Sequence, residues 1–234
     1  MSERILGLVG GTGPESTVDY YRTFIEVWQR RSPVDSYPRV IINSVEARRL
    51  FAALEVEAYD RIADQVVEAL GQLASAGVGR AMLASNATHL AFEQIAPRSP
   101  LPLIHIADVT AAAAAARGLR RLALIGTRYV TQSSMYPDRL RAAGIATVIP
   151  TDAEQAWIHE RYFNEFVRGV FLDATRDGLA KIVGAMRTRD RVDGVILGGT
   201  ELALILTEPT CAGVPVLNTA RIHVEGGVDW LLGG

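Results

Sequence analysis

The sequence is poor in the residues that build disulfides and metal sites. Among its 234 residues it has one cysteine, Cys211, and four histidines. A single cysteine cannot form an intramolecular disulfide, which suits a reducing compartment. The histidines and the cysteine are too scattered to have the spacing of metal ligands. We therefore expect a cytoplasmic protein without a metal site, in which Cys211 is a packing residue.

A strong charge of one sign and a long apolar run are also missing. The formal net charge is −2, and no basic cluster with interleaved aromatic residues occurs. The sequence therefore lacks the electrostatic signature of a nucleic-acid-binding protein. No apolar run approaches the roughly 20 residues of a membrane-spanning helix, and the N-terminus has no signal-peptide pattern. We expect neither a nucleic-acid partner nor a membrane partner.

What the sequence does contain is a regular alternation of short apolar runs with amphipathic segments. The runs are typical of buried strands and lie at residues 5–9, 40–43, 80–84, 103–104, 122–125, 146–149, 194–197 and 214–217. The helical patterns between them lie at residues 15–31, 58–76, 107–117, 135–143, 153–170 and 175–188. This alternation predicts parallel sheets with helices on both faces.

Two pairs of segments indicate a duplicated fold. Residues 5–13 resemble residues 122–128, and residues 80–89 resemble residues 193–201, in the same order in each half. We therefore predict an α/β fold of two pseudo-symmetric doubly wound parallel-sheet units with an interdomain cleft. Ligands of such folds bind outside the carboxyl ends of the strands. The alternative is that any parallel-sheet protein has several similar strand ends.

Several short motifs together carry a family resemblance. They lie at residues 10–17 (GGTGPEST), 85–89 (SNATH), 126–127, 162–169, 198–201 (GGTE) and 218–223 (NTARIH). In this order they resemble the aspartate/glutamate racemase family over nearly the whole chain. The resemblance implies that the last segment returns to the first unit, so that the two units comprise residues 1–104 plus 214–234 and residues 105–213. The resemblance implies an isomerase of amino acid metabolism that is independent of pyridoxal phosphate and of any other cofactor, acts on a small carboxylate substrate and forms a homodimer. In that family both strand ends carry a catalytic cysteine, and here Ser85 and Gly199 replace the two cysteines.

The glycine-rich turn after the first strand is a candidate anion site. Gly10 to Gly13 follow a strand and open a helix at Pro14, so backbone N–H groups there can hold a small carboxylate. The spacing required for a dinucleotide is absent. Gly11 and Thr12 are therefore candidate substrate-binding residues. The alternative is that the glycines serve only the backbone geometry of the turn.

The second motif supplies further candidates. Asn86 has both a donor and an acceptor for an amino acid or a carboxylate, and Ala87 follows it in the motif. Ser85 stands where the family holds a thiol base, but an unactivated hydroxyl needs an adjacent general base. His89, four residues later, could be that base, or its ring could bond only to the backbone.

The mirror motifs in the second half supply the remaining groups. The resemblance makes Thr127 and Thr200 contacts of the substrate carboxylate. Glu201 is a candidate general acid or base, with a hydrogen-bonding role at the helix start as the alternative. Gly199 has no side chain for chemistry, and we expect it to leave room for a bulkier substrate.

Two arginines and one histidine complete the predicted site. Arg168 stands where the family often has a lysine that meets the distal carboxylate, and arginine can bind a carboxylate with two hydrogen bonds. Its alternative role is that of a cation at a helix C-terminus. Arg48 is another carboxylate candidate. His223 resembles a family position near the second thiol and is a candidate catalytic residue.

Three functions follow from these residues. The first is isomerisation of a small acidic amino acid or dicarboxylate, with non-standard proton transfer because both thiols are replaced. The second is a lyase, decarboxylase or cyclase reaction on a carboxylate in the same cleft. The third is a non-catalytic ligand-binding paralogue that keeps the cleft and has lost the chemistry.

Overall fold

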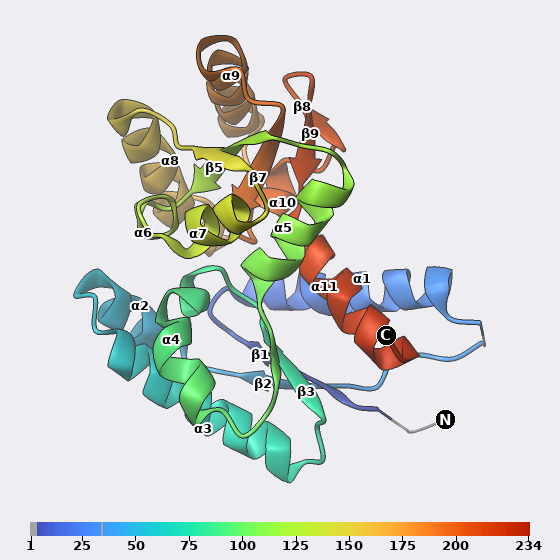
Figure 1. Ribbon diagram of the computed structural model, residues 1–234. Helices are drawn as coiled ribbons and strands as arrows, with labels where there is room; N and C mark the ends of the chain where they lie inside the picture. The colour runs from blue at the N-terminus through green and yellow to red at the C-terminus, as the bar shows by residue number, and fades with distance from the viewer. Residues whose placement is uncertain (1–3, 34) are drawn as a thin grey trace. The chain divides into compact units, whose positions relative to one another are not determined.

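The computed structural model describes residues 4–33 and 35–234. The chain forms two compact units. The first is Met1–Ile106 together with Ala220–Gly234, and the second is Ala107–Thr219. The second unit is therefore inserted between the body of the first unit and its last helix. Each unit has its own sheet with helices packed on it (Figure 1).

The sheet of the first unit has the strand order β2-β1-β3-β4, and all its neighbours are parallel. Its strands are β1 Leu6–Gly10, β2 Val40–Ser44, β3 Arg80–Leu83 and β4 Leu103–Ile104. Its helices are α1 Pro14–Arg31, α2 Ala47–Glu55, α3 Tyr59–Ser75, α4 Phe92–Ile95 and α11 Thr219–Leu232, with 3₁₀ turns at Ala87–Ala91 and Ala96–Arg98. Proline at the first position of α1 is favourable because its missing N–H has no partner there in any helix.

Close helix packing buries both faces of β1. On one face, a Cβ atom added to Gly7 would lie 3.1 Å from Leu73 of α3. On the other face, a Cβ atom added to Gly227 of α11 would lie 2.6 Å from Met82 and 2.9 Å from Leu6. Figure 1 shows α3 on one side of this sheet and α1 and α11 on the other. The last helix of the chain is therefore part of the core of the first unit.

The sheet of the second unit has the order β6-β5-β7-β9-β8, in which only β8 is antiparallel. Its strands are β5 Arg121–Gly126, β6 Ala146–Val148, β7 Gly194–Gly198, β8 Thr210–Cys211 and β9 Val214–Leu217. Its helices are α5 Ile106–Ala116, α6 Arg128–Thr131, α7 Met135–Ala142, α8 Asp152–Asn164, α9 Asp173–Asp190 and α10 Leu202–Ile205, with a 3₁₀ turn at Phe166–Arg168.

The core of this unit lies between the sheet and the helices α8 and α9. Alternate residues of β5 and β7 pack against apolar residues of these helices and of the turn between them. The buried members include Ala123, Ile125, Val195 and Leu197 from the sheet, and Ile158, Tyr162, Phe166, Leu179, Val183 and Met186 from the helices and the turn.

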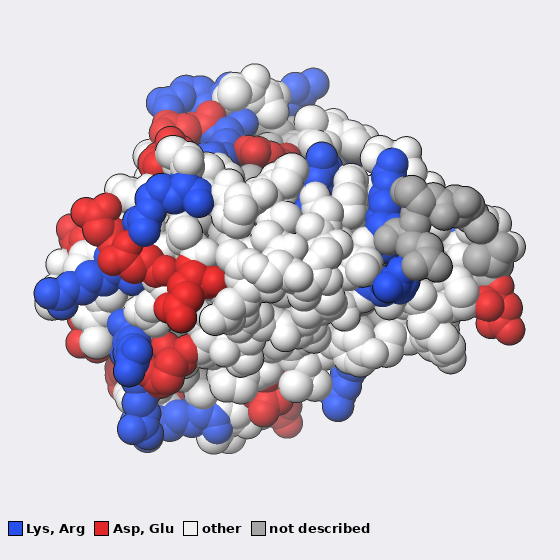
Figure 2. Space-filling view, turned by 90° about the horizontal axis from the view of Figure 1, so that it is seen from below, with Lys and Arg blue, Asp and Glu red and all other residues white. Residues whose placement is uncertain are grey.

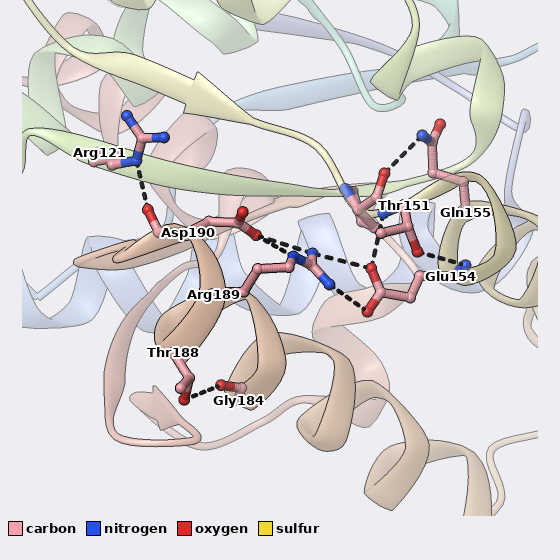
Figure 3. A network of polar contacts seen from close by, with 9 residues as sticks. Arg121, Thr151, Glu154, Gln155, Gly184, Thr188, Arg189 and Asp190 are labelled. Atoms are coloured by element: carbon pink, nitrogen blue, oxygen red, sulfur yellow. Dashed lines mark hydrogen bonds and ion pairs between the residues drawn. The ribbon is translucent and has the colours of Figure 1, made fainter.

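A polar network fixes the start of α8 against the end of α9 (Figure 3). Thr151 and Glu154 form a capping box, in which each side chain accepts a hydrogen bond from the other residue's N–H. The guanidinium of Arg189 lies 3.2 Å from both carboxylate oxygens of Glu154 and 2.9 Å from Asp190. Burial favours the neutral acid, but hydrogen bonds from Arg189 and Thr151 outweigh it and hold the pKa of Glu154 below its usual range.

The predicted fold class is confirmed: two mostly parallel α/β sheets with helices make up the chain. The order β2-β1-β3-β4 of the first sheet reappears as β6-β5-β7-β9 in the second, which is the arrangement that a duplication would produce. The interdomain cleft stays a prediction.

Three details differ from the expectations. The strand β9 pairs with β7, so Val214–Leu217 belongs to the second unit, and only the helix after it returns to the first. This corrects the expected boundary at residue 214. The helix expected at 153–170 ends at Asn164 and gives way to a 3₁₀ turn closed by Gly169, whose φ is 72°. The helices α2, α4, α6, α10 and α11 and the short strand β8 were not expected.

Candidate functional site

Both sheets have a topological switch point. In the first sheet β1 lies between β2 and β3, so the two strands that follow β1 in the chain pair with its opposite edges. In the second sheet β5 lies between β6 and β7 in the same way. Ligands of open α/β sheets bind outside the carboxyl ends of the strands at such points. Most of the residues predicted from the sequence lie at these two places.

The first-unit site consists of Gly11, Thr12, Ser85, Asn86 and Ala87. The register pairs Val9 with Leu83, so the residues that follow β1 and β3 emerge at the same edge of the sheet. All of these side chains except that of Ala87 are buried, as is Gly11. The structure therefore places five of the seven binding and catalytic candidates of the first half at one edge of the sheet.

The glycine turn of this site has a clear backbone role. Gly11 has a φ of 93°, and a side chain on it would collide with the backbone of Val45. Its N–H donates to Thr17 Oγ1 at 2.9 Å, and that hydroxyl donates to the carbonyl of Gly13 at 3.2 Å. The hydroxyl of Ser16 is buried and has no hydrogen-bond partner among the described residues. The turn therefore needs its glycine for geometry, and Ser16 adds a free hydroxyl that sequence reasoning did not single out.

Ser85 is held by its own turn. Its Oγ accepts a hydrogen bond from the N–H of Ala87 at 3.2 Å. The ring of His89 contacts the Ser85 carbonyl through Nδ1 at 2.8 Å and accepts the N–H of Ile106 at Nε2 at 3.2 Å. Nδ1 must therefore carry the proton, and both ring nitrogens have backbone partners. This geometry favours the structural interpretation of His89 over a role as the base of Ser85.

His223 lies in the core of the first unit. Its Nε2 donates to the carbonyl of Ile104 at 2.8 Å, which leaves Nδ1 to accept from the hydroxyl of Tyr20 at 3.0 Å. Its side chain is fully buried. Burial, with a smaller contribution from His89, lowers the pKa of His223 to about 3. The ring is therefore neutral near pH 7, and its contacts are those of a structural residue.

The second-unit site consists of Thr127, Tyr162, Gly199, Thr200 and Glu201. The register pairs Gly126 with Gly198, so Thr127 and Gly199 follow on neighbouring strands. The Thr127 hydroxyl is buried and has no hydrogen-bond partner among the described residues, so it can donate to a ligand carboxylate. Glu201 Oε2 accepts hydrogen bonds from the Tyr162 hydroxyl and, at 3.2 Å, from Thr200 Oγ1.

The expectation that Gly199 leaves room for a substrate is wrong. The ring of Tyr162 fills the space beside it, because a Cβ atom on Gly199 would lie 2.5 Å from the phenol oxygen and 2.6 Å from Cε2. Tyr162 is the residue that sequence reasoning missed. It belongs to a segment that carried the resemblance, but only the fold places it against Gly199.

The two candidate arginines are available for a ligand. Arg48 and Arg168 are exposed, and in the described part of the chain neither side chain takes part in an ion pair. On the face shown in Figure 2, acidic and basic side chains are interspersed, with no continuous field of one sign. The roles of Arg48 and Arg168 toward a distal carboxylate stay predictions.

A small pocket adjoins the first-unit site. It is lined by Thr12, Ala87 and Thr88 together with the larger apolar side chains Leu50, Phe51, Leu54 and Ile62. Most of these apolar residues come from α2.

Among residues 4–33 and 35–234 no group of three or more potential metal ligands occurs, and no helix is long and apolar enough to cross a membrane. Cys211 is buried in the second core, as expected for a packing residue.

Comparison with known proteins gives one consistent result. A family model described as Asp/Glu/Hydantoin racemase matches residues 9–226. The broad specificity amino-acid racemase RacX of Bacillus subtilis is 24% identical over 156 residues, covering 65% of this chain and 67% of RacX.

Solved structures agree with the family match. A proposed Asp/Glu racemase from Yersinia pestis superimposes with a TM-score of 0.87 at 28% identity, over 98% of this chain and 99% of that one. An aspartate racemase homologue from Pyrococcus horikoshii superimposes with a TM-score of 0.84, also at 28% identity and with the same coverage.

Proposed function

This chain belongs to the Asp/Glu/Hydantoin racemase family, and from that premise we propose that it is a cofactor-independent isomerase that inverts the α-carbon of a small acidic amino acid. Racemisation requires removal of the α-proton and its return on the opposite face, which two positioned acid–base groups achieve best. The replacement of both family cysteines by Ser85 and Gly199 means that at least one of these groups is not a thiol.

One observation carries this proposal more than any other. The buried hydroxyl of Thr127 has no partner among the described residues and lies at the switch point of the second sheet, where Thr127 follows β5 and the buried Glu201 follows the neighbouring strand β7. A buried hydroxyl without a partner costs stability, so a site that retains one is best explained by a ligand that accepts its hydrogen bond. The α-carboxylate of an amino acid is such a ligand, and the exposed arginines Arg48 and Arg168 would suit a second carboxylate.

A second substrate class has its own support. This support comes from a relative and not from the pocket beside Thr12 and Ala87, whose volume of about 10 Å³ is too small for a substrate side chain. RacX, with its broad specificity for amino acids, shows that a relative of this chain is not confined to acidic substrates. Neutral amino acids therefore belong in any substrate panel.

The alternatives expected from the sequence are weaker. The relatives described above are racemases or proteins likened to them, so they give no support to a lyase, decarboxylase or cyclase. A non-catalytic ligand-binding role would leave the carboxylate contacts in place without proton transfer. The homodimer, the cytoplasmic location and the independence from pyridoxal phosphate stay part of the proposal.

Proton exchange in heavy water tests this function. The purified protein is incubated without cofactor with the L- and D-forms of aspartate, glutamate and several neutral amino acids, and deuterium at the α-position is followed by NMR. Chiral chromatography of the same samples measures inversion. We expect exchange and inversion with at least one amino acid.

A Thr127→Val protein purified in parallel controls for a contaminating host racemase, because its own activity should fall while a contaminant's would not. Binding of an amino acid without any exchange would contradict the isomerase and favour a ligand-binding role.

A further inference from the structure

The phenol of Tyr162 lies at the place where a side chain of residue 199 would begin. A Cβ atom on Gly199 would be 2.5 Å from the phenol oxygen, 2.6 Å from Cε2 and 2.9 Å from Cζ. No residue other than glycine could therefore occupy position 199 without displacing this ring. Glycine at 199 and tyrosine at 162 are a matched pair.

Packing and hydrogen bonds fix the orientation of this phenol. The ring makes an edge contact with Phe166 at 5.7 Å between centroids and a tilted contact with Phe163 at 6.0 Å. Its hydroxyl donates to Glu201 Oε2. The capping box and the Arg189 network hold the first turn of the helix that carries it. The hydroxyl and the carboxylate are thus preorganised rather than free to rotate.

The pair lies where a substrate is expected. Gly199, Thr200 and Glu201 directly follow β7, and Thr127 follows the neighbouring strand at the switch point. Tyr162 is 7% exposed and Glu201 is 6% exposed, so the pair is shielded from bulk water. A phenol and a carboxylate in direct hydrogen-bond contact, at the switch point that also carries the Thr127 hydroxyl, have the composition of a proton relay.

We propose that Tyr162, in relay with Glu201, is the proton-transferring group of the second-unit site, a proposal that rests on the isomerase function. In the forward step the phenol oxygen takes the α-proton of the amino acid while the phenolic proton passes to the carboxylate of Glu201. The electron pair of the broken Cα–H bond stays on the substrate and is delocalised into its carboxylate. Tyr162 ends neutral, and Glu201 ends as the neutral acid. The reverse step returns a proton to the α-carbon.

The environment of the phenol explains why a relay is needed. Burial, the charge of Glu201 and the hydrogen bond to it hold the pKa of Tyr162 well above its usual range. A free phenolate is therefore not available near neutral pH. Transfer of the phenolic proton to Glu201 in the same step avoids forming one.

Tyr162→Phe tests this relay, because it removes the hydroxyl and keeps the ring. We expect α-proton exchange in heavy water to fall by at least about 100-fold, the lower end of the contribution of a general acid–base group. Glu201→Gln should cause a loss of the same order, and the double variant should be no slower than the slower single variant, because both changes interrupt one relay.

Tyr136→Phe is the matched control. Tyr136 is also a fully buried tyrosine of the second unit, and its hydroxyl bonds to Thr110 and Thr219. Its loss should lower stability without changing the exchange rate.

If Tyr162→Phe does not fold, a ring-fluorinated tyrosine at position 162 keeps the shape and makes the phenol more acidic. The pH–rate profile of exchange should then shift relative to the unmodified enzyme, and an unchanged profile would count against the relay.

The outcomes separate the two proposals. If the unmodified enzyme catalyses exchange and Tyr162→Phe catalyses it at the same rate, the role of Tyr162 is overturned and the isomerase function stands. No exchange by the unmodified enzyme with any amino acid overturns both.

Discussion

The contact between Gly199 and Tyr162 predicts that the smallest possible side chain at position 199 destabilises the protein. In Gly199→Ala the new methyl group would meet three atoms of a ring that Phe166 and Glu201 hold in place. The φ angle of Gly199 is not in the left-handed region, so the cost is steric rather than conformational. Overpacking of this kind costs about 1–3 kcal/mol, and the entropy lost by the unfolded chain offsets about 0.4–1 kcal/mol of it.

Urea unfolding of the purified variant measures this change. We expect the free energy of unfolding to fall by about 1.3 kcal/mol, the difference between the midpoints of the two ranges above. Gly71→Ala is the control, because Gly71 lies in α3 and a Cβ atom there would meet nothing within 4 Å. That variant should be more stable than the parent by about 0.5–1 kcal/mol, the gain of alanine over glycine inside a helix.

A double-mutant cycle identifies the cause. In a Tyr162→Ala background the methyl group of Gly199→Ala has no ring to collide with, so its cost should disappear. The coupling energy between the two positions should then be at least about 1 kcal/mol. A Gly199→Ala protein as stable as the parent, or two changes that simply add, would refute the close packing of this pair.

Three further predictions concern single residues. Thr127→Val should leave stability unchanged or raise it by up to about 1 kcal/mol, because a buried hydroxyl without a partner is lost, while calorimetric titration should show weaker amino acid binding. His223 is neutral in the folded protein because its pKa is lowered to about 3, whereas in the unfolded chain it binds a proton near the ordinary histidine pKa of about 6.5. The free energy of unfolding should therefore fall by up to about 1.4 kcal/mol per pH unit below about pH 6.5. Urea unfolding between pH 7 and 5 should show less of this slope in His223→Gln. Arg168→Ala should weaken dicarboxylate binding by about 1.5–3 kcal/mol, whereas Arg141→Ala, which breaks only an exposed ion pair with Asp138, should not; equal affinities would remove Arg168 from the site.

The sequence was sufficient for every described strand except the two-residue β8, and for the strand ends at which the candidate residues lie. Buried parallel strands are continuous apolar runs, and small polar residues directly after them mark the carboxyl ends. Gly11, Ser85, Thr127 and Gly199 were therefore placed correctly at strand ends without any knowledge of tertiary contacts. The helices α2, α4, α6 and α10 were missed because they span nine residues or fewer, too few for their periodicity to stand out, and the 14-residue α11 was missed as well.

What could not be predicted depends on contacts between distant residues. Gly199 has no side chain, and whether the space beside it is empty or filled depends on Tyr162, 37 positions earlier in the chain and on a different element. The hydrogen bonds of His223 go to Ile104 and Tyr20, which no local pattern connects to it. A histidine or a glycine in a motif therefore has an uncertain role until its neighbours in space are known.

The insertion of one unit into the other has a consequence for the order in which the protein is built. The second unit is continuous in sequence, so it can complete its core as soon as residue 219 has been synthesised. The first unit cannot, because α11, whose Gly227 packs against Leu6 and Met82, follows the second unit in the sequence. On the ribosome, apolar residues of the first unit made before residue 107 stay uncovered until α11 emerges, so removal of α11 would expose the core of the first unit.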